Sequence, residues 1–454
     1  MKLYISKSIL TILVFLFLSG CDSFLNVRPS TSNVNPSTIK DFQEMLNSDS
    51  LATSSFILAD IMSDDAMMVR SDKNEFYGNA YLWNKSIWTE ADNDFMYNSA
   101  YTRILQLNIL LNKAEKVSTG NPADLTAKNI ILAQAKVHRA WFYLQLVNLY
   151  GNDYTSGSPQ TDPAVPLILN PDAGVKPKRA TVKEIYDQII KDLSSAVTTP
   201  DLPAMGQTVI HPGRAAAFAL LARTYLYMGN YSAALTNANA ALDLKNTLAD
   251  YNALEVIPVS LLDQKDNRET MLAKMGQDVH YINRYTSSML GSDEVLDLLT
   301  YQDQRRNLSF SMYGNNYISV NGIMTFNYSI GVPEVMLIKA ECLARKDNTE
   351  EALSLINALR EKRLNNPEPL TGISTDILKI VLEERRRELF FHGGLRLFDL
   401  KRLNRDERFR KTLERTEQYQ STVLSTLEPN SPRYLMEIAP RIIDNNKDIV
   451  PNPR

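Results

Sequence analysis

The stretch GRAAAFALLARTYLYMGNYSAALTNANAALDL, residues 213–244, decides the fold. Its apolar residues recur at helical spacing, which predicts two helices, 214–228 and 231–244, around a turn at Gly229-Asn230. Small residues let two helices approach closely, and tyrosines fill the space beside them. The residues of these two kinds are Ala222, Tyr225, Tyr231, Ala234, Ala238 and Ala241. The stretch therefore predicts a closely packed helix pair.

A weaker copy of this pair runs from Glu334 to Glu361. Ala340 and Ala352 are spaced there as Ala222 and Ala234 are in the first copy. This pattern is typical of tetratricopeptide repeats, which stack helix pairs into one scaffold. We therefore expect a mainly α-helical fold of this type, with irregular loop-rich insertions and a few short strands.

Helical periodicity also marks other parts of the chain. It predicts helices over 95–117, 128–150 and 182–197, and a capping box of Thr181 and Glu184 opens the last of these. These helices extend the predicted scaffold on the N-terminal side of the repeat pair.

The C-terminal part contains a further helical segment, 376–403, which His392-Gly393-Gly394 interrupts. The remaining tail, 404–454, is polar and rich in proline. We expect it to wrap the surface.

Between the two helix pairs lies the segment 246–333, which mixes short apolar runs with Gly, Asn, Ser and Tyr. This composition predicts short strands and loops, with a helix near 293–299. Long ordered loops are usually functional, so we expect this insertion to carry a ligand-binding site. The rest of the mature chain divides into an N-terminal helical region, 37–245, and a C-terminal region, 334–454.

The N-terminus has the pattern of a lipoprotein signal. A basic start precedes the apolar run 9–18, and the sequence LSGC at 18–21 closes it. The run is shorter than the roughly 20 residues that a membrane span requires. We therefore expect 1–20 to be a signal peptide, Cys21 to be lipidated, and 21–36 to be a flexible leader. An ordinary secretory signal is the alternative.

Composition and motifs argue against several classes of function. The net charge of −3, with 22% charged residues, is not that of a nucleic-acid-binding protein. The four histidines lack metal-ligand spacing, and the sequence has no nucleophile elbow or phosphate loop. With Cys21 lipidated, Cys342 has no partner for a disulfide. We predict no enzymatic activity, no cofactor, no metal and no nucleic-acid partner.

Aromatic residues in loop-rich segments are the candidate binding residues, because flat rings pack against the apolar faces of sugar rings. One group lies just before the helix 95–117, and the other lies in the insertion. The candidates are Trp83, Trp88, Tyr281, Tyr285, Tyr313 and Tyr317. Each could instead be a structural aromatic, and Trp141 is expected in the core.

The charged segment 384–389 and the group Arg396, Asp399 and Arg402 could suggest catalysis. A structural ion-pair network that ties the last helices to the repeats is the interpretation we favour. Loss of Arg396 should then lower stability and leave ligand affinity near normal.

Several short motifs occur in order along nearly the whole chain. They are Cys21-Asp22-Ser23-Phe24-Leu25, Tyr101-x-x-Ile104-x-x-x-Asn108, Ala135-x-x-x-Arg139-Ala140-Trp141-Phe142-Tyr143, Leu149-Tyr150-Gly151, Val165-Pro166-Leu167, Arg179-Ala180-Thr181-Val182, Gly213-Arg214, Leu221-Ala222-Arg223-x-Tyr225-Leu226, Glu384-Arg385-Arg386-Arg387-Glu388-Leu389 and Arg396-Leu397-Phe398-Asp399-Leu400-Lys401-Arg402. In these motifs the chain resembles the SusD/RagB-like outer-membrane nutrient-binding lipoproteins of Bacteroidetes. His392 departs from the family's usual Glu, and Ile438-Ala439-Pro440 matches its C-terminal motif only loosely.

The resemblance implies a lipid-anchored protein of the outer membrane that faces the cell exterior. It also implies a SusC-like TonB-dependent transporter as partner and a nutrient glycan as ligand, delivered by the closing of the lipoprotein lid. Two alternatives stay open. RagB-like members of the family serve oligopeptide uptake, and the chain could be a structural lid of the transporter with no ligand of its own.

Overall fold

The computed structural model describes residues 35–68, 75–172, 176–253, 268–276, 289–313, 317–320, 327–371, 376–416 and 422–454, and every structural statement below refers to these ranges. The predicted signal peptide, Cys21 and most of the leader lie outside them. Among the described helices, none combines the length and apolarity needed to cross a bilayer.

Helices dominate the molecule. The longer ones are α3 (Ile39–Leu46), α6 (Phe95–Lys116), α7 (Pro122–Tyr150), α8 (Val182–Val197), α9 (Arg214–Tyr227), α10 (Tyr231–Leu244), α15 (Val332–Ala344), α16 (Thr349–Glu361), α17 (Ile377–Leu389) and α18 (Leu395–Leu403). The shorter ones are α4 (Ile57–Ile61), α5 (Phe76–Tyr81), α12 (Asp293–Leu298), α13 (Gln304–Ser309) and α19 (Pro440–Asn445).

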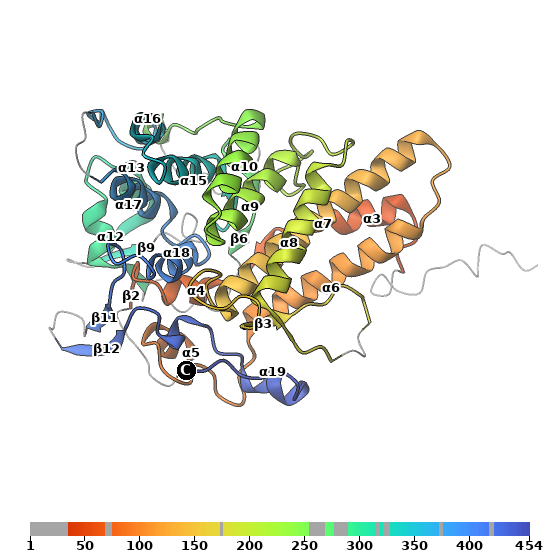
Figure 1. The fold of residues 1–454 in the computed structure, drawn as a ribbon, viewed down its shortest axis with the longest axis horizontal. Coiled ribbons are helices and arrows are strands. Elements are labelled where there is room, and N and C mark those ends of the chain that lie inside the picture. The colour runs from red at the N-terminus through yellow and green to blue at the C-terminus, as the bar shows by residue number, and fades with distance from the viewer. Residues whose placement is uncertain are drawn as a thin grey trace, which may run out of the picture.

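The helices form a continuous stack in which successive neighbours pack side by side. α6 packs on α7, α7 on α8, α8 on α9, α9 on α10, α10 on α15, and α15 on both α16 and α17. In Figure 1 this stack runs from α3, α6 and α7 on the right to α15, α16 and α17 on the left. The structure confirms the predicted mainly α-helical scaffold with two related helix pairs.

Local sequence signals explain several helix ends. The Thr181 hydroxyl accepts from the Glu184 amide, and the Glu184 side chain accepts from the Thr181 amide, which confirms the predicted capping box. The predicted interruption between α17 and α18 is also observed. Gly394, the N-cap of α18, has a φ of 83°, a left-handed conformation that favours glycine. A side chain there would also meet Ala59, which lies 2.4 Å from the position of a Cβ.

One predicted boundary is wrong. α7 begins at Pro122 rather than at 128, with Asn121 as its N-cap and Pro122 in the first turn. The first turns of this helix are largely exposed and therefore carry no apolar periodicity. Capping chemistry, not hydrophobic spacing, marks this start.

The strands are short, and two of their pairings join the N-terminal part of the chain to the insertion. The strands are β1 (Thr53–Ser54), β2 (Ala66–Met68), β3 (Pro163–Pro166), β4 (Arg179–Thr181), β5 (Thr270–Leu272), β6 (Met275–Gly276), β7 (Met289–Gly291), β8 (Phe310–Tyr313), β9 (Tyr317–Val320), β10 (Ile330–Gly331), β11 (Leu413–Thr416) and β12 (Val423–Leu427). The two joining pairings are those of β1 with β6 and of β2 with β7. The largest sheet has the order β2-β7-β9-β8 and is antiparallel throughout. The predicted short strands of 246–333 are thus confirmed.

The C-terminal tail lies deeper than predicted. β11 and β12 form a hairpin, and Met436, Ile438 and Ala439 are buried. The amide of Met436 donates to the carbonyl oxygen of Leu149 on α7. The tail is therefore part of the packed body and not only a surface wrapping.

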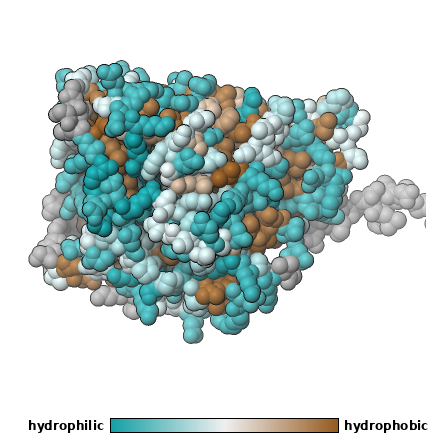
Figure 2. Space-filling view, viewed as in Figure 1, coloured by the Kyte–Doolittle hydropathy of each residue, from teal (hydrophilic) through white to brown (hydrophobic). Residues whose placement is uncertain are grey.

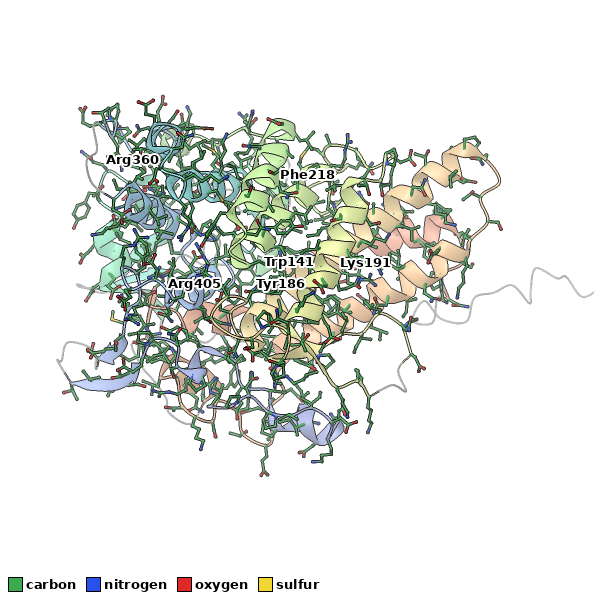
Figure 3. All side chains as sticks on the ribbon, in the orientation of Figure 1. Trp141, Tyr186, Lys191, Phe218, Arg360 and Arg405 are labelled. Carbon is green, nitrogen blue, oxygen red and sulfur yellow. The ribbon has the colours of Figure 1, made fainter. Side chains whose placement is uncertain are left out.

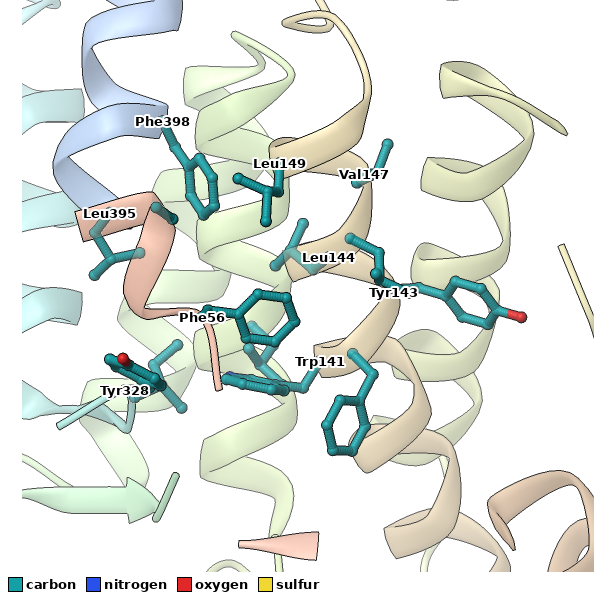
Figure 4. Close-up of a cluster of buried hydrophobic side chains, with 14 of the residues drawn as sticks. Phe56, Trp141, Tyr143, Leu144, Val147, Leu149, Tyr328, Leu395 and Phe398 are labelled. Atoms are coloured by element: carbon teal, nitrogen blue, oxygen red, sulfur yellow. The ribbon is translucent and has the colours of Figure 1, made fainter. Parts of the chain in front are cut away.

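The core consists of a large cluster that runs from α3 to α15 and a smaller one between α15, α16 and α17. Trp141 is fully buried, as predicted, and its ring meets that of Phe56 edge to face at 6.0 Å (Figure 4). The visible outer face mixes hydrophilic residues with small separate hydrophobic patches (Figure 2).

Candidate ligand-binding site

Trp83 is not an exposed binding residue. Its side chain is 0% exposed, and its ring nitrogen donates to the carbonyl oxygen of Met62 at 2.8 Å. The guanidinium of Arg415 lies over its ring, 4.3 Å from the centroid. Trp83 therefore takes the structural role that was its alternative, because a residue more than three hundred positions away covers its ring.

Trp88 is also buried. It is 4% exposed, stacks on Phe76 at 5.2 Å, and donates from its ring nitrogen to the carbonyl oxygen of Glu437 at 3.0 Å. The Glu437 carboxylate also accepts from the amides of Ile87 and Trp88. The tail therefore fastens this loop, and Trp88 takes the structural role that was the alternative for it.

The four candidate tyrosines of the insertion divide into two pairs. Tyr281 and Tyr285 lie outside the described residues. Tyr313 and Tyr317 are paired directly across the β8–β9 hairpin, at the edge of the four-stranded sheet. The structure thus brings these two positions together, and their role in binding stays a prediction.

Sequence reasoning missed an exposed aromatic in the same insertion. Tyr301, between α12 and α13, is 84% exposed and is the only aromatic among the large hydrophobic residues that are exposed in the described part of the chain. The guanidinium of Arg306 lies 4.6 Å from its ring centroid and is itself held by the carbonyl oxygens of Leu296 and Leu299. The ring is therefore supported and available to a ligand. Its neighbours in sequence carry no aromatic pattern that would have singled it out.

The charged residues of the last helices form a buried ion-pair network, as predicted. We call it the charged layer and define it as Arg385, Arg396, Asp399 and Arg402 with their partners Asp64 and Glu341. Arg402 binds both oxygens of Glu341 at 2.6 and 2.7 Å and reaches Asp399 at 2.7 Å.

The other two arginines of the charged layer also bind carboxylates. Arg385 reaches Asp399 at 2.7 Å, and Arg396 binds both oxygens of Asp64 at 2.7 and 2.9 Å. Burial alone would raise the pKa of Glu341, but the adjacent Arg402 guanidinium outweighs it and lowers that pKa to about 2. The layer ties α17 and α18 to α15 and to the N-terminal segment, which is a structural role.

The adjacent acids Asp64 and Asp65 are engaged in the same way. Asp64 pairs with Arg386, Arg396 and Lys411, and Asp65 pairs with Arg386. Carboxylates bound by guanidinium groups are poor general acids or bases. Within the ranges described, no group of three or more His, Cys, Asp or Glu side chains is placed to hold a metal ion.

The departure at His392 has a local explanation. Its Nδ1 lies 2.8 Å from the carbonyl oxygen of Phe390, and burial lowers its pKa. A neutral imidazole therefore takes part in the turn between α17 and α18.

A hollow of about 380 Å³ lies between α6, α7 and α8. Lys191 borders it (Figure 3), and its buried side contains Arg139, which binds both oxygens of Asp192 at 2.8 Å and the Asn108 side chain at 2.8 Å. Gln188 completes this arrangement by donating to Asp192. Because its buried polar groups are partnered within the protein, this hollow gives no sign of a missing ligand.

Two family models match the chain. One is described as "Starch-binding associating with outer membrane" (SusD-like) and matches residues 23–226. The other is described as "SusD family" (SusD_RagB) and matches residues 260–454. A search of curated proteins gives no match.

Solved structures share the fold over almost the whole chain. A protein of Bacteroides vulgatus, provisionally described as sugar binding, has a TM-score of 0.77 at 21% identity and covers 93% of this chain and 99% of its own. A SusD superfamily protein of Bacteroides thetaiotaomicron has a TM-score of 0.74 at 24% identity and covers 92% and 100%. A SusD-like carbohydrate binding protein of Bacteroides vulgatus has a TM-score of 0.68 at 19% identity and covers 91% and 98%. The helical scaffold is therefore shared with these proteins over more than nine tenths of this chain.

Proposed function

The chain belongs to the SusD family, and on this premise we propose that it is a nutrient-binding protein of the outer membrane that binds an oligosaccharide or polysaccharide. The observation that carries the proposal is the match of both family models, one of them described as starch-binding and associated with the outer membrane. Two structural relatives are described as sugar or carbohydrate binding, which supports the same ligand class. The binding role requires no catalytic group.

The insertion is the proposed binding surface. Tyr301 supplies a supported and exposed ring, and the paired positions Tyr313 and Tyr317 lie on the hairpin that follows α13 in the chain. Tyr281 and Tyr285 remain candidates by sequence. Rings stack on the apolar face of a sugar, while amide and guanidinium groups bind its hydroxyls.

Retardation of the protein in gels that contain soluble polysaccharides tests this surface. Tyr301→Ala and Tyr317→Ala should each reduce retardation severalfold without loss of folding, since Tyr301 makes few contacts that hold the fold. Val450→Ala, which truncates another exposed apolar side chain outside the insertion, is the matched control and should leave retardation unchanged. Retardation that is identical for all three variants would exclude the insertion as the binding surface.

Anchoring and delivery complete the proposed function. The sequence at 18–21 supports lipidation of Cys21, and several acyl chains on one residue hold a protein to a membrane durably. A SusC-like TonB-dependent transporter would then receive the captured glycan beneath this lipoprotein. Replacement of Cys21 by Ser should release the protein from the outer membrane and abolish incorporation of labelled fatty acid. Unchanged membrane attachment of that variant would contradict the anchor.

Copurification tests the transporter. Mild detergent extraction of the native protein should bring down a TonB-dependent barrel of the same cell. A response to oligopeptides in place of glycans would favour peptide uptake, and a barrel complex without response to either ligand would favour a structural lid.

A further inference from the structure

A second hollow lies outside the insertion, where three distant parts of the chain meet. It is lined by the loop that follows α7 (residues 152–157), by Lys401 on α18 and Asn404 at its C-terminal cap, and by the tail segment 430–435, and it has a volume of about 170 Å³. We call it the polar hollow. Arg405, labelled in Figure 3, reaches the same loop through Asp153 at 3.7 Å. The space exceeds roughly tenfold the 10–15 Å³ that one water requires.

Two deeply buried polar side chains border the polar hollow without completing a hydrogen bond. Asn404 and Tyr434 are each 2% exposed, and neither the Asn404 Nδ2 nor the Tyr434 hydroxyl has a partner among the described residues. The Asn404 amide lies beside the Tyr434 hydroxyl, so these two groups can bond only to each other or to a molecule in the hollow. Buried polar groups normally have partners, so a pair of unpartnered ones at the wall of an open hollow indicates a missing ligand.

The lining of the polar hollow contains one cationic and one anionic side chain, Lys401 and Asp153. Lys401 donates to the carbonyl oxygens of Asn148 and Gly151 at 2.5 and 2.7 Å, so its ammonium is held by neutral acceptors. Asp153 uses one carboxylate oxygen, Oδ2, for the amides of Thr155 and Ser156. With one cation and one anion on its wall, the site favours neither an anionic nor a cationic ligand.

The rest of the wall supplies hydroxyl, amide and aromatic groups. Ser156, Asn430 and Ser431 contribute short polar side chains, and the rings and methyls of Tyr434 and Leu435 contribute an apolar side. A neutral sugar ring has hydroxyls on its edge and an apolar face, which matches this mixture.

We propose that the polar hollow is a binding site for a single neutral sugar ring, separate from the insertion surface, with Asn404 and Tyr434 as its hydrogen-bonding residues. The ring can come from a free monosaccharide or from the end of a longer glycan, because both present the same hydroxyls. The inference goes beyond the proposed function and does not require the insertion to bind anything.

Ligand-observed NMR on the full chain tests the proposal, with D-glucose, D-galactose, D-mannose and D-xylose as probes and their disaccharides in a second arm. At least one neutral sugar should bind weakly, and glucuronic acid and glucosamine should bind no better than their neutral parent. Binding of disaccharides alone would assign the site to a glycan end, and binding of free monosaccharides would assign it to those. If no neutral sugar binds at tens of millimolar, the proposal fails.

Two variants locate the binding. Tyr434→Phe and Asn404→Leu remove the unpartnered groups at nearly constant volume, so each should weaken binding about fivefold to tenfold without lowering the melting temperature. Tyr227→Phe is the matched control, because its hydroxyl is also buried and unpartnered but lies outside the hollow. It should leave sugar binding unchanged. Equal binding by all three variants, or loss of binding in proportion to loss of stability, would overturn the assignment. Polysaccharide retardation through the insertion should persist in all of them.

Discussion

The charged layer and the polar hollow meet at the end of α18, where Arg402 of the first and Asn404 of the second are bonded in opposite ways. In the charged layer, Arg402 meets Glu341 and Asp399 with short bonds on several of its nitrogens. In the polar hollow, Asn404, two residues further along, leaves its amide nitrogen without a partner. The Arg402 guanidinium stabilises the fold, whereas the Asn404 amide is available to the proposed sugar ligand.

The difference shows how to separate structural from binding residues in this molecule. Removing one partner of a buried ion pair strands a charge and is strongly destabilising. Removing a buried polar group that has no partner should leave the free energy of unfolding unchanged or raise it, because no hydrogen bond offset the cost of taking that group out of water. Substitutions across the two regions should therefore form a graded series in stability.

The largest effect is expected from Arg402→Ala. It removes the main counter-charge of the buried Glu341 and one of the two guanidinium partners of the buried Asp399, which should lower the free energy of unfolding by about 3–5 kcal/mol. Denaturant titration measures this change. Arg408→Ala is the control on the surface and should change little, since that side chain is exposed and neither of its partners, Asp376 and Asp406, is buried. A stability loss in Arg402→Ala no larger than in Arg408→Ala would contradict the structural role of the layer.

Asp94 is an intermediate case, a buried carboxylate that has only neutral donors. Its oxygens accept from the Tyr97 amide at 3.0 Å and from the Tyr150 hydroxyl at 2.6 Å. Burial raises its pKa to about 7 against these hydrogen bonds, so the folded state favours the protonated form. This contribution to stability is fully present below about pH 4 and is lost as pH rises towards about 7, by up to about 4 kcal/mol.

Asp94→Asn isolates this effect, because an amide keeps the N-cap acceptor and cannot ionise. Unfolding measured at several pH values should show a shallower fall in stability with rising pH in the variant than in the parent. Identical pH dependence in both proteins would mean that Asp94 does not titrate as described.

A smaller loss is expected from Arg396→Ala. Asp64 keeps Arg386 and Lys411 as counter-charges, so the variant should lose about 1–2 kcal/mol and retain near-normal glycan affinity. Melting temperature and gel retardation measured together check both parts. Unchanged stability with lost binding would move Arg396 from the structural group to the binding group.

The smallest effect on stability belongs to Tyr434→Phe. Its hydroxyl has no partner to lose, so the melting temperature should stay the same or rise slightly. A clear fall in thermal stability would show that the hydroxyl is bonded within the folded protein, and the contrast between the two regions would then disappear.

The sequence was sufficient where the controlling signal is local. The small residues of 213–244 predict α9 and α10, and Thr181 with Glu184 predicts the start of α8. The left-handed Gly394 marks the break before α18. Each of these features depends on residues within a few positions of one another.

It was insufficient where distant segments meet. Glu437 covers Trp88, and Arg415 covers Trp83, so two aromatics that look loop-borne in sequence are buried in the fold. The polar hollow has the same origin, because no local pattern joins Asn404 to Tyr434. Tyr301 is the opposite case, an exposed aromatic that the sequence did not single out. Its exposure depends on which distant segments do not cover it.

Calorimetry on the chain lacking residues 1–21 tests the central claim most directly, with neutral oligosaccharides and oligopeptides of similar length as titrants. Membership of the SusD family and the exposed ring of Tyr301 predict saturable heat with at least one oligosaccharide and none with the peptides. Saturable heat with peptides alone, or with neither class, would contradict the account.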